Sequence, residues 1–334
     1  MSESEAAAAR AEERREARRL AAQVGRSVVG AALAKAQSAG LGEPMESDIS
    51  RSAKQKAEIL VEALPYIRRF AGNVIVVKYG GSLSKEGSEA TLDTFVQDIS
   101  LMRAVGMKPV VVHGGGPQIG EMMARLGKES IFKDGLRVTD AETLEIARMV
   151  LVGKVNPEIV AAMNTETPMA VGLSGADAGL ITAEARGDEL GFVGDVVGVD
   201  PSLLNRLLIE ELVPVIATIG SDQAGQAYNI NADAVAGAVA EALDAEKLIY
   251  LTDVPGILSD AGDPASLIAT LDSRSLAAMM ADGSLRGGMI PKAASCLRAV
   301  RSGVGAAHVL DGRVAHAVLL EIFTDEGTGT MITP

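Results

Sequence analysis

The sequence predicts an α/β protein whose mainly parallel sheet is covered by helices on both faces. Apolar runs of strand length alternate with amphipathic helical runs along most of the chain, and continuous apolar strands are typical of parallel sheets that are buried on both sides. Thirty-six glycines and only 3% aromatic residues in 334 residues suit many short turns. A chain of this length can bury one large core or two medium domains.

The expected strands and helices alternate in a regular order. The strands are expected at 73–79, 108–113, 169–173, 213–218, 247–252 and 306–310. The helices are expected at about 90–105, 117–126, 141–152, 202–209, 231–243 and 288–302. Gly, Asp and alternating side chains at 128–140 and 180–199 predict hairpins that act as lids over the strand ends.

The first 71 residues differ from the rest. Ala, Arg and Glu dominate the start, and Gly/Ser-rich breaks follow, so residues 1–50 are predicted to be a low-complexity, flexible tail. Residues 51–71 carry an amphipathic helical pattern, and Pro65 predicts a kink in it. This helix has no place inside a parallel sheet, so we expect it to pack on another subunit.

Composition excludes several classes of protein. A net charge of −13 and a pI near 4.8 argue against a general surface for nucleic acid or anionic membrane. The single cysteine, Cys296, excludes an intramolecular disulfide, is expected to be buried, and fits a reducing cytoplasm. No apolar run reaches the roughly 18 residues of a membrane span. We therefore expect a soluble cytoplasmic protein.

Two strands run directly into glycine turns. The first ends in Lys78-Tyr79-Gly80-Gly81, and the second in His113-Gly114-Gly115-Gly116 followed by a helical pattern. Glycine allows backbone N–H groups to close on an anion, and a following helix adds its dipole. Neither turn is a Walker loop or a dinucleotide fingerprint. The pair favours a nucleotide-phosphate site over two plain strand–helix connections.

Charged and amide side chains provide four further candidate ligand-binding positions, three of which are described here and the fourth in the next paragraph. Lys78 ends a buried strand, where open α/β sheets bind ligands, although it could also extend to solvent at the sheet rim. Lys292 lies in the first turn of a helix, where a cation is unfavourable unless an anion is near. Asn229, Asn231 and Asp233 open another helix, where capping alone would account for two of them.

Arg137 lies in the lid at 128–140, in the run Asp134-Gly135-Leu136-Arg137-Val138-Thr139. Its guanidinium suits a bidentate grip on a substrate carboxylate, and a surface salt bridge is the alternative. The three histidines show no zinc-binding spacing, and Gly172-Leu173-Ser174-Gly175 is not a hydrolase elbow. Two lysines, glycine turns, an aspartate, an arginine and amides together favour phosphoryl transfer by positioning and charge neutralisation.

These segments together resemble the amino-acid kinase family, and within it the members that phosphorylate N-acetyl-L-glutamate. The similarity runs from about Ser52 to Ile332. Besides the runs quoted above, it is carried by Gly153-Lys154-Val155-Asn156, Asn229-Ile230-Asn231-Ala232-Asp233, Leu251-Thr252-Asp253-Val254 and Gly288-Met289-Ile290-Pro291-Lys292. The resemblance implies a three-layer αβα sandwich with a mainly parallel open sheet, preceded by the N-terminal helix.

The resemblance also implies a division of labour. Residues 72–334 would form the family's domain, with 72–212 binding the acyl amino acid and forming a dimer, and 213–334 binding ATP. ATP would come with Mg²⁺ as co-substrate, with no tightly bound cofactor and no metal site made by protein side chains. The reaction would move the γ-phosphate of ATP onto the γ-carboxylate of N-acetyl-L-glutamate, in arginine biosynthesis.

Site residues follow from the motifs that match. Catalysis would rest on Lys78 and Lys292, with Asp233 orienting both lysines. The substrate would contact Gly114, Gly115, Arg137, Asn229 and Asn231. The nucleotide would contact Gly80, Gly81, Gly116, Thr252, Asp253, Val254 and Met289.

The resemblance extends to arginine-inhibited members, whose N-terminal helix links dimers into a hexamer, a trimer of dimers. An inhibitory L-arginine would lie among Tyr66, His308, Glu321 and Gly327. The chain departs from the family at Ala176, Ala178 and Thr328. Two alternatives stay open: another member of the family (glutamate, aspartate, carbamate or uridylate kinase), or an inactive nucleotide-binding regulatory protein.

Overall fold

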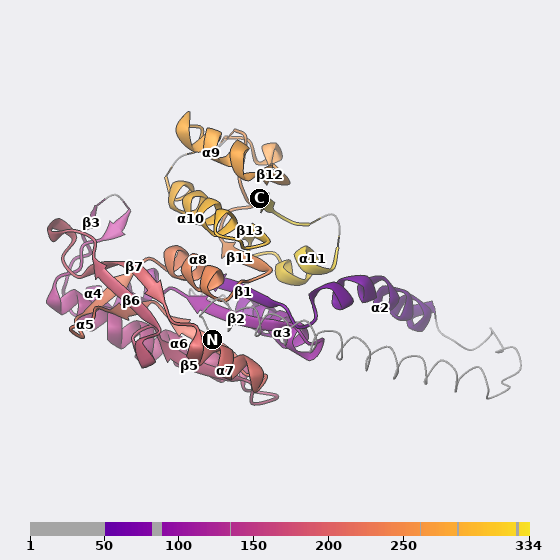
Figure 1. Cartoon of the computed structure of the whole chain (residues 1–334), viewed down its shortest axis with the longest axis horizontal. Helices are drawn as coiled ribbons and strands as arrows, with labels where there is room; N and C mark the ends of the chain where they lie inside the picture. The colour runs from indigo at the N-terminus through magenta and orange to yellow at the C-terminus, as the bar shows by residue number, and fades with distance from the viewer. Residues whose placement is uncertain (1–50, 82–88, 134, 261, 286, 325–326) are drawn as a thin grey trace, which may run out of the picture. The chain divides into compact units, whose positions relative to one another are not determined.

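The computed structural model describes residues 51–81, 89–133, 135–260, 262–285, 287–324 and 327–334 (Figure 1). The tail predicted at 1–50 lies outside the described residues. Contacts divide the chain into two units, 1–61 and 62–334. Helix α2 (Arg51–Phe70) begins in the first unit and ends in the second, and it is continuous through Pro65. The division expected near residue 212 stays a prediction.

An open eight-stranded sheet forms the centre of the second unit, in the order β12–β14–β13–β11–β1–β2–β8–β5. All neighbours from β13 to β5 are parallel, and β14 runs antiparallel to β13. This confirms the predicted mainly parallel sheet. The strands are β1 (Val74–Tyr79), β2 (Lys108–His113), β5 (Ala170–Ser174), β8 (Val213–Ala217), β11 (Lys247–Thr252), β12 (Thr270–Asp272), β13 (Ala306–Asp311) and β14 (Thr330–Thr333).

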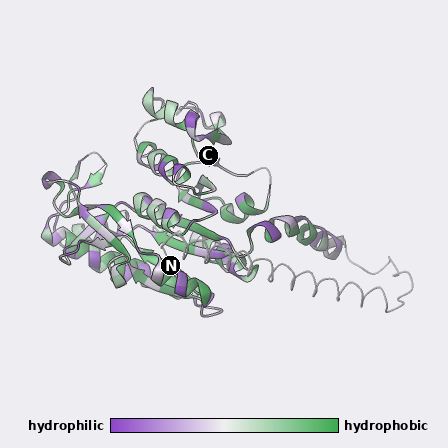
Figure 2. Cartoon of the chain, viewed as in Figure 1, coloured by the Kyte–Doolittle hydropathy of each residue, from purple (hydrophilic) through white to green (hydrophobic). Residues whose placement is uncertain are grey.

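Helices cover both faces of this sheet, which gives three layers. Side chains of β1 alternate between two cores: Ile75 and Val77 belong to one, and Val76 to the other. The first core includes α3 (Glu89–Ala104), α4 (Gly116–Arg125), α5 (Ala141–Val150), α6 (Asn156–Met163) and α11 (Ala317–Phe323). The second includes α7 (Ser202–Ile209), α8 (Ala232–Ala242), α9 (Ser273–Ala281) and α10 (Met289–Arg301). Figure 2 shows the central strands as predominantly hydrophobic.

Both segments that were predicted as lids are hairpins, and their role as lids stays a prediction. Strands β3 (Phe132–Lys133) and β4 (Leu136–Arg137) pair antiparallel. Strands β6 (Ile181–Ala185) and β7 (Val193–Val199) also pair antiparallel, with a register shift between Thr182 and Ala183. They close a four-stranded group with β9 (Ile219–Ser221) and β10 (Ala227–Ile230). Strand β10 carries Asn229 and leads directly into α8, which carries Asp233. The four-stranded group is therefore continuous with both elements.

Several elements differ from the sequence prediction. The helix expected at 141–152 is α5, which passes into a π-helical turn, η2 (Leu151–Val155), and then into α6. Helices α9 and α11 and strands β9, β10, β12 and β14 were not expected. They are three to nine residues long, and such short elements carry too few apolar repeats to show a period.

The structure also bears on the predicted place of Cys296 and on membrane-spanning helices. Cys296 is fully buried on α10, which confirms its expected place in the core. None of the described helices is long and apolar enough to cross a bilayer.

Candidate active site

Three charged side chains from distant parts of the chain meet at the carboxyl end of β1. Lys78 lies on β1, Asp233 in the first turn of α8, and Lys292 in the first turn of α10. Lys78 Nζ lies 2.9 Å from Asp233 Oδ1, and Lys292 Nζ lies 3.0 Å from Asp233 Oδ2. The sequence prediction singled out all three residues, and the structure brings them together.

Asp233 stays ionised in this buried place. Burial raises its pKa, but the two lysine ammonium groups lower it by more, so the pKa lies below its ordinary value. The carboxylate therefore neutralises one of two cations, and the cluster keeps one net positive charge. A buried excess positive charge of this kind is stabilised by an anionic ligand.

Neighbouring groups fix Asp233 in place. Asn231 caps α8, because its Oδ1 accepts hydrogen bonds from the N–H groups of Asp233 and Ala234. The hydroxyls of Tyr250 and Ser295 both donate to the carbonyl oxygen of Asp233, at 3.1 and 2.8 Å. The structure thus gives Asn231 a capping role, and Ser295 connects α10 to α8 near Lys292.

The two glycine turns touch each other beside this cluster. A Cβ added to Gly81 would lie 3.1 Å from both Cα and N of Gly115, a tight contact with backbone that glycine avoids. A Cβ on Gly114 would lie 3.3 Å from the Cβ of Ala232, the residue before Asp233. Gly115 also stands at the N-terminus of α4, which no side chain caps. Uncapped helical N–H groups beside a cationic cluster form an anion site.

Arg137 lies on the hairpin strand β4 and is buried. It donates to the carbonyl oxygen of Gly116 at 2.8 Å and to the hydroxyl of Ser130, and it stacks 4.8 Å above the ring of Phe132. Among the described residues, no carboxylate forms an ion pair with it, and burial lowers the pKa of its guanidinium. The Arg137 guanidinium thus lies beside the glycine turn, and its positive charge could form an ion pair with a ligand carboxylate.

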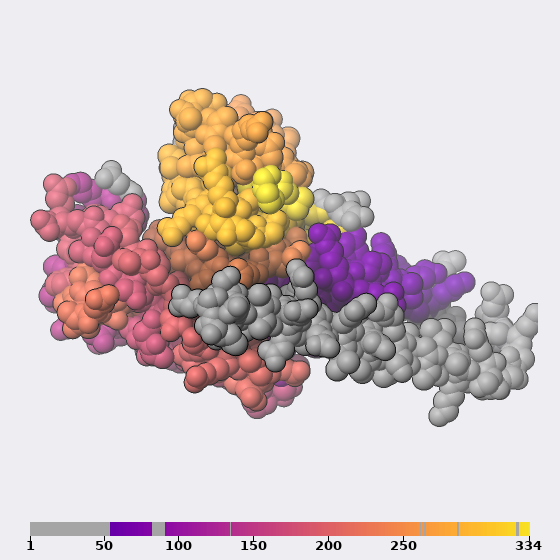
Figure 3. All heavy atoms as spheres, in the orientation of Figure 1, coloured from indigo at the N-terminus to yellow at the C-terminus, as the bar shows by residue number. Residues whose placement is uncertain are grey.

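The remaining predicted residues lie on β10, at the end of β11, in the loop that follows it and at the start of α10. Asn229 is half-buried on β10, and its N–H donates to the carbonyl oxygen of Phe192 at 2.9 Å. Thr252 ends β11 and is buried, whereas Asp253 and Val254 are exposed in the loop that follows. Met289 begins α10 and packs against the second core. Figure 3 shows a hollow between the orange-to-yellow C-terminal half and the rose-coloured lid region.

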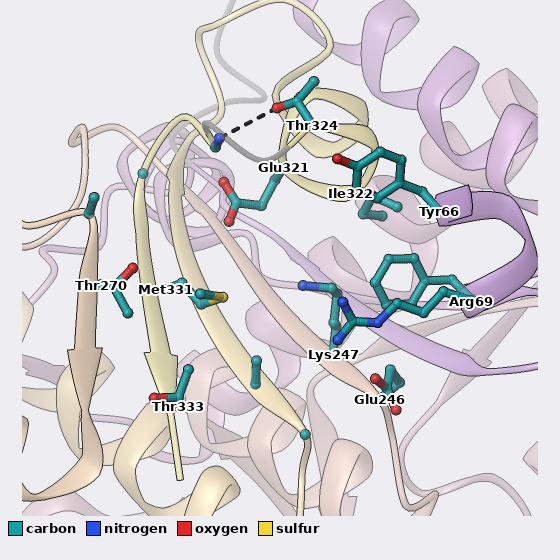
Figure 4. Close-up of a pocket in the computed structure, with 16 residues that line it drawn as sticks. Tyr66, Arg69, Glu246, Lys247, Thr270, Glu321, Ile322, Thr324, Met331 and Thr333 are labelled. Atoms are coloured by element: carbon teal, nitrogen blue, oxygen red, sulfur yellow. Dashed lines mark hydrogen bonds between the residues drawn. The ribbon is translucent and has the colours of Figure 1, made fainter. Parts of the chain in front are cut away.

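A cavity away from this cluster, which we call the second cavity, lies at the amino end of β11 (Figure 4). It has a volume of about 360 Å³ and is lined by Tyr66 and Arg69 of α2, Lys247 of β11 and Glu321 of α11, among others. Gly327 also lines it, and its N–H donates to the hydroxyl of Thr324 at 3.4 Å. Three of the four residues predicted for an effector site, Tyr66, Glu321 and Gly327, line this cavity. The fourth, His308, is fully buried and contacts two lining residues, Lys247 and Glu321.

A chain of hydrogen bonds connects the charges around this second cavity. The ammonium of Lys247 donates to His308 Nε2 at 2.9 Å, so His308 carries its proton on Nδ1, which donates to Glu321 Oε1 at 2.7 Å. The N–H of Thr328 donates to the other oxygen of Glu321 at 2.9 Å. Burial raises the pKa of Glu321, but these donors lower it by more, so it lies below its ordinary value. Glu321 is therefore a buried anion.

Sequence reasoning missed two cations of this cavity, Arg69 and Lys247. Lys247 begins the apolar run Lys247-Leu248-Ile249-Tyr250-Leu251, and it is buried. A lysine inside a buried strand was a usable signal, of the same kind as the one that identified Lys78. It passed unnoticed because it stands at the amino end of its strand, away from the edge where ligands bind.

The model of the amino acid kinase family matches residues 73–311. The chain belongs to the amino acid kinase family.

Curated relatives of this amino acid kinase match most of its length and nearly all of their own. It is 53% identical over 294 residues to an acetylglutamate kinase of Symbiobacterium thermophilum, which covers 85% of this chain and 99% of the relative. It is 52% identical over 282 residues to the acetylglutamate kinase of Thermosynechococcus vestitus, covering 84% and 95%.

A similar solved structure is the N-acetylglutamate synthase of Neisseria gonorrhoeae. In its complex with coenzyme A and N-acetyl-glutamate it superimposes with a TM-score of 0.74 at 27% identity, over 83% of this chain and 63% of the synthase. In its complex with coenzyme A and L-arginine the TM-score is 0.69 at 25% identity, over 83% and 65%.

Proposed function

We propose that this kinase transfers the γ-phosphoryl group of ATP to the γ-carboxylate of N-acetyl-L-glutamate. The products are N-acetyl-L-glutamyl 5-phosphate and ADP, and the reaction is the second step of arginine biosynthesis. The observation that carries the proposal is the buried Lys78–Asp233–Lys292 cluster beside two glycine turns. The acetylglutamate kinases that are 52% and 53% identical to the chain supply the substrate.

The chemistry needs no general base. A γ-carboxylate oxygen attacks Pγ while the bond from Pγ to the β–γ bridging oxygen breaks, and the carboxylate is already ionised near neutral pH. The two ammonium groups neutralise charge on the equatorial and bridging oxygens, where it develops in the transition state. Asp233 holds both ammonium groups in place. The N–H groups of Gly81, Gly115 and Gly116 offer hydrogen bonds to phosphate oxygens.

Mg²⁺ accompanies ATP as part of the co-substrate, where it neutralises phosphate charge. Asp233 is already engaged by two lysines. The metal is therefore held through the nucleotide's phosphate oxygens, and Asp233 is left to orient the lysines.

Arg137 and Asn229 hold the α-carboxylate of the acyl amino acid, with Asn231, Gly114 and Gly115 beside them. The buried guanidinium supports this assignment, because it needs a carboxylate partner in place of bulk water. On the opposite side of the site, Thr252, Asp253, Val254 and Met289 surround the adenosine, and Gly80, Gly81 and Gly116 the phosphates. Most of the acyl-amino-acid contacts then come from residues 72–212, and all of the adenosine contacts come from residues 213–334.

The test is ADP release with a panel of acceptors: N-acetyl-L-glutamate, L-glutamate, L-aspartate, carbamate and UMP. The proposal predicts turnover on N-acetyl-L-glutamate at a kcat/KM at least about 100-fold above any other acceptor, because Arg137 and the amides recognise the whole acyl amino acid. Preference for another acceptor would favour a different member of the family. Failure on all five would favour the inactive regulatory protein.

We also propose that the second cavity binds L-arginine as a feedback inhibitor. Glu321 would pair with the guanidinium, while Arg69 or Lys247 would receive the α-carboxylate. A cavity with both signs of charge suits a zwitterion with a cationic side chain. The complex of the related synthase with L-arginine supports a site of this class in similar folds. Titrating arginine into the turnover assay tests this proposal.

Helix α2 would join dimers into a hexamer in the cytoplasm. It leaves Ile59, Leu60 and Val61 exposed, at 57%, 69% and 70%, as expected for an interface helix. Deleting residues 1–70 is predicted to yield dimers that ignore arginine, since Tyr66 and Arg69 are lost too. Deleting only residues 1–50 is predicted to leave a hexamer, which analytical ultracentrifugation distinguishes. A hexamer from the shorter chain 71–334 would contradict the role given to α2.

A further inference from the structure

His113 ends β2 immediately before the glycine turn and is fully buried. Asn156 begins α6 immediately after the π-helical turn η2, and it is buried as well. The Asn156 amide nitrogen lies 3.0 Å from His113 Nε2 and 2.9 Å from the carbonyl oxygen of Val215 on β8. On its other side, His113 Nδ1 lies 3.0 Å from the carbonyl oxygen of Gly114.

These contacts determine where the His113 proton resides. The carbonyl oxygen of Val215 can only accept, so the Asn156 atom beside it must be the NH₂ group. That same NH₂ group faces His113 Nε2, which must therefore accept. The proton of the neutral ring then lies on Nδ1 and is donated to Gly114. The Asn156 oxygen packs against Gly172, where an added Cβ would collide with it.

The bond from His113 to Gly114 sets the direction of the next N–H group. In a trans peptide the carbonyl of Gly114 and the N–H of Gly115 point in opposite directions. Holding the carbonyl toward the imidazole turns the Gly115 N–H away from it. The nitrogen of Gly115 faces the first glycine turn, because it lies 3.1 Å from the Cβ position of Gly81.

The π-helical turn supports the same peptide from the other side. A Cβ on Gly115 would lie 2.7 Å from Leu151 Cδ2 and 3.3 Å from Val155 Cγ2, two residues of η2. The wider π turn brings Leu151, Val155 and Asn156 to one place, and such turns are frequent at functional sites. Packing and hydrogen bonding therefore converge on the Gly114–Gly115 peptide.

We propose that His113, held in its Nδ1–H tautomer by Asn156, is a positioning residue that aims the Gly115 N–H at the phosphoryl group in transfer. It touches no substrate and acts through the backbone of the turn. This inference rests on the proposed phosphoryl transfer. It adds that one specific ring nitrogen, Nδ1, carries the effect.

Two substitutions separate the roles of the ring nitrogens. The amide nitrogen of His113→Asn takes the place of Nδ1 and keeps a donor to Gly114. The amide oxygen of His113→Gln takes the place of Nε2 and keeps the acceptor for Asn156, but loses that donor. We expect kcat of the Gln variant to fall about 10- to 100-fold with KM for both substrates nearly unchanged, while the Asn variant keeps kcat within about threefold. Thermal unfolding of both variants measures any loss of stability.

Equal kcat values in two folded variants would overturn the inference and leave His113 a purely structural residue. If neither variant folds, magic-angle-spinning NMR of the wild-type protein labelled at histidine decides, because the chain has only three histidines. A protonated Nδ1 with an unprotonated Nε2 at His113 supports the inference, and a protonated Nε2 overturns it. Absence of wild-type turnover on N-acetyl-L-glutamate would refute the proposed function, a result distinct from equal variants.

Discussion

Lys292 donates a 3.0 Å hydrogen bond to Asp233, a residue 59 positions earlier in the chain. The bond joins the first turns of α10 and α8, and the other oxygen of the carboxylate binds Lys78. A cation in the first turn of a helix is electrostatically unfavourable. The position of Lys292 is therefore explained by its ion pair with Asp233 rather than by the stability of α10, and it suits the anionic ligand proposed above.

Replacing Lys292 with Ala should lower kcat about 10²- to 10³-fold, since a charge aimed at the transferring group is lost. Arg298→Ala is the matched control, because Arg298 lies on the same helix in an exposed ion pair with Glu241. The control should keep its kcat within about twofold. Steady-state kinetics with circular dichroism checks both variants. Near-normal turnover of Lys292→Ala would remove the lysine from the mechanism.

Replacing Arg137 with Ala should chiefly raise KM for the acyl amino acid, by about 10- to 100-fold, because a charge-assisted carboxylate contact is lost. Arg137→Lys should recover only part of the loss, since an ammonium lacks the planar fork of the guanidinium. Arg186→Ala, which breaks an exposed ion pair with Asp195 on the other lid, controls for general effects on hairpins. If only KM for ATP changed, Arg137 would contact ATP and not the acyl amino acid, which would contradict its assignment.

Glu321→Gln should weaken inhibition by L-arginine about 10- to 100-fold, because the guanidinium loses its charged partner. Turnover without arginine is measured in parallel, so that loss of inhibition is not confused with loss of activity. Glu241→Gln, on α8 and outside the cavity, serves as the control. Unchanged inhibition of the Glu321 variant would mean that arginine, if it inhibits at all, binds elsewhere.

Stability should fall as the pH drops from about 6.5 to about 4. Burial lowers the pKa of His113 to about 4, although its bond to Gly114 opposes the shift. Below the unfolded-state pKa of about 6.5 the unfolded chain therefore binds a proton that the native state does not, so acid favours unfolding. Neutral His113 contributes its full share to the free energy of unfolding above about pH 6.5. Near pH 4 the free energy of unfolding is lower by about 3 kcal/mol.

Urea unfolding at several pH values measures this loss. His113→Asn has no titrating ring, so its stability should depend less steeply on pH in that window. His308, whose pKa burial also lowers, contributes in the same direction in both proteins and cancels in the comparison. Parallel curves for the wild type and the variant would show that His113 does not titrate as the structure requires.

Local patterns singled out these candidate site residues because each of them broke a local rule. Lys78 ended an apolar strand, Lys292 opposed a helix dipole, and Asn229 exceeded what capping needs. The convergence of Lys78 and Lys292 on the Asp233 carboxylate depends on the order β11–β1–β2, a long-range pairing that a single sequence does not encode in any short window. The family resemblance implied the mainly parallel open sheet, and the structure supplies the order of its strands.

The second cavity shows where local reasoning failed. Lys247 and Arg69 became visible as partners only when β11, α2 and α11 were brought together. Strand β14, which lies between β12 and β13, pairs antiparallel with β13 at the end of the chain. The π turn η2 was invisible too, since its apolar residues fit an ordinary helix equally well. Tertiary packing decided these features.

The most direct test of the central claim is to trap the product. Incubating the protein with Mg²⁺-ATP, N-acetyl-L-glutamate and hydroxylamine converts any acyl phosphate into a stable hydroxamate, which mass spectrometry identifies. We predict N-acetyl-glutamyl hydroxamate in amounts matching the ADP released, and almost none from Lys292→Ala. ADP release without hydroxamate would contradict transfer to a carboxylate, and hydroxamate at the wild-type rate from Lys292→Ala would contradict the role of the Lys78–Asp233–Lys292 cluster.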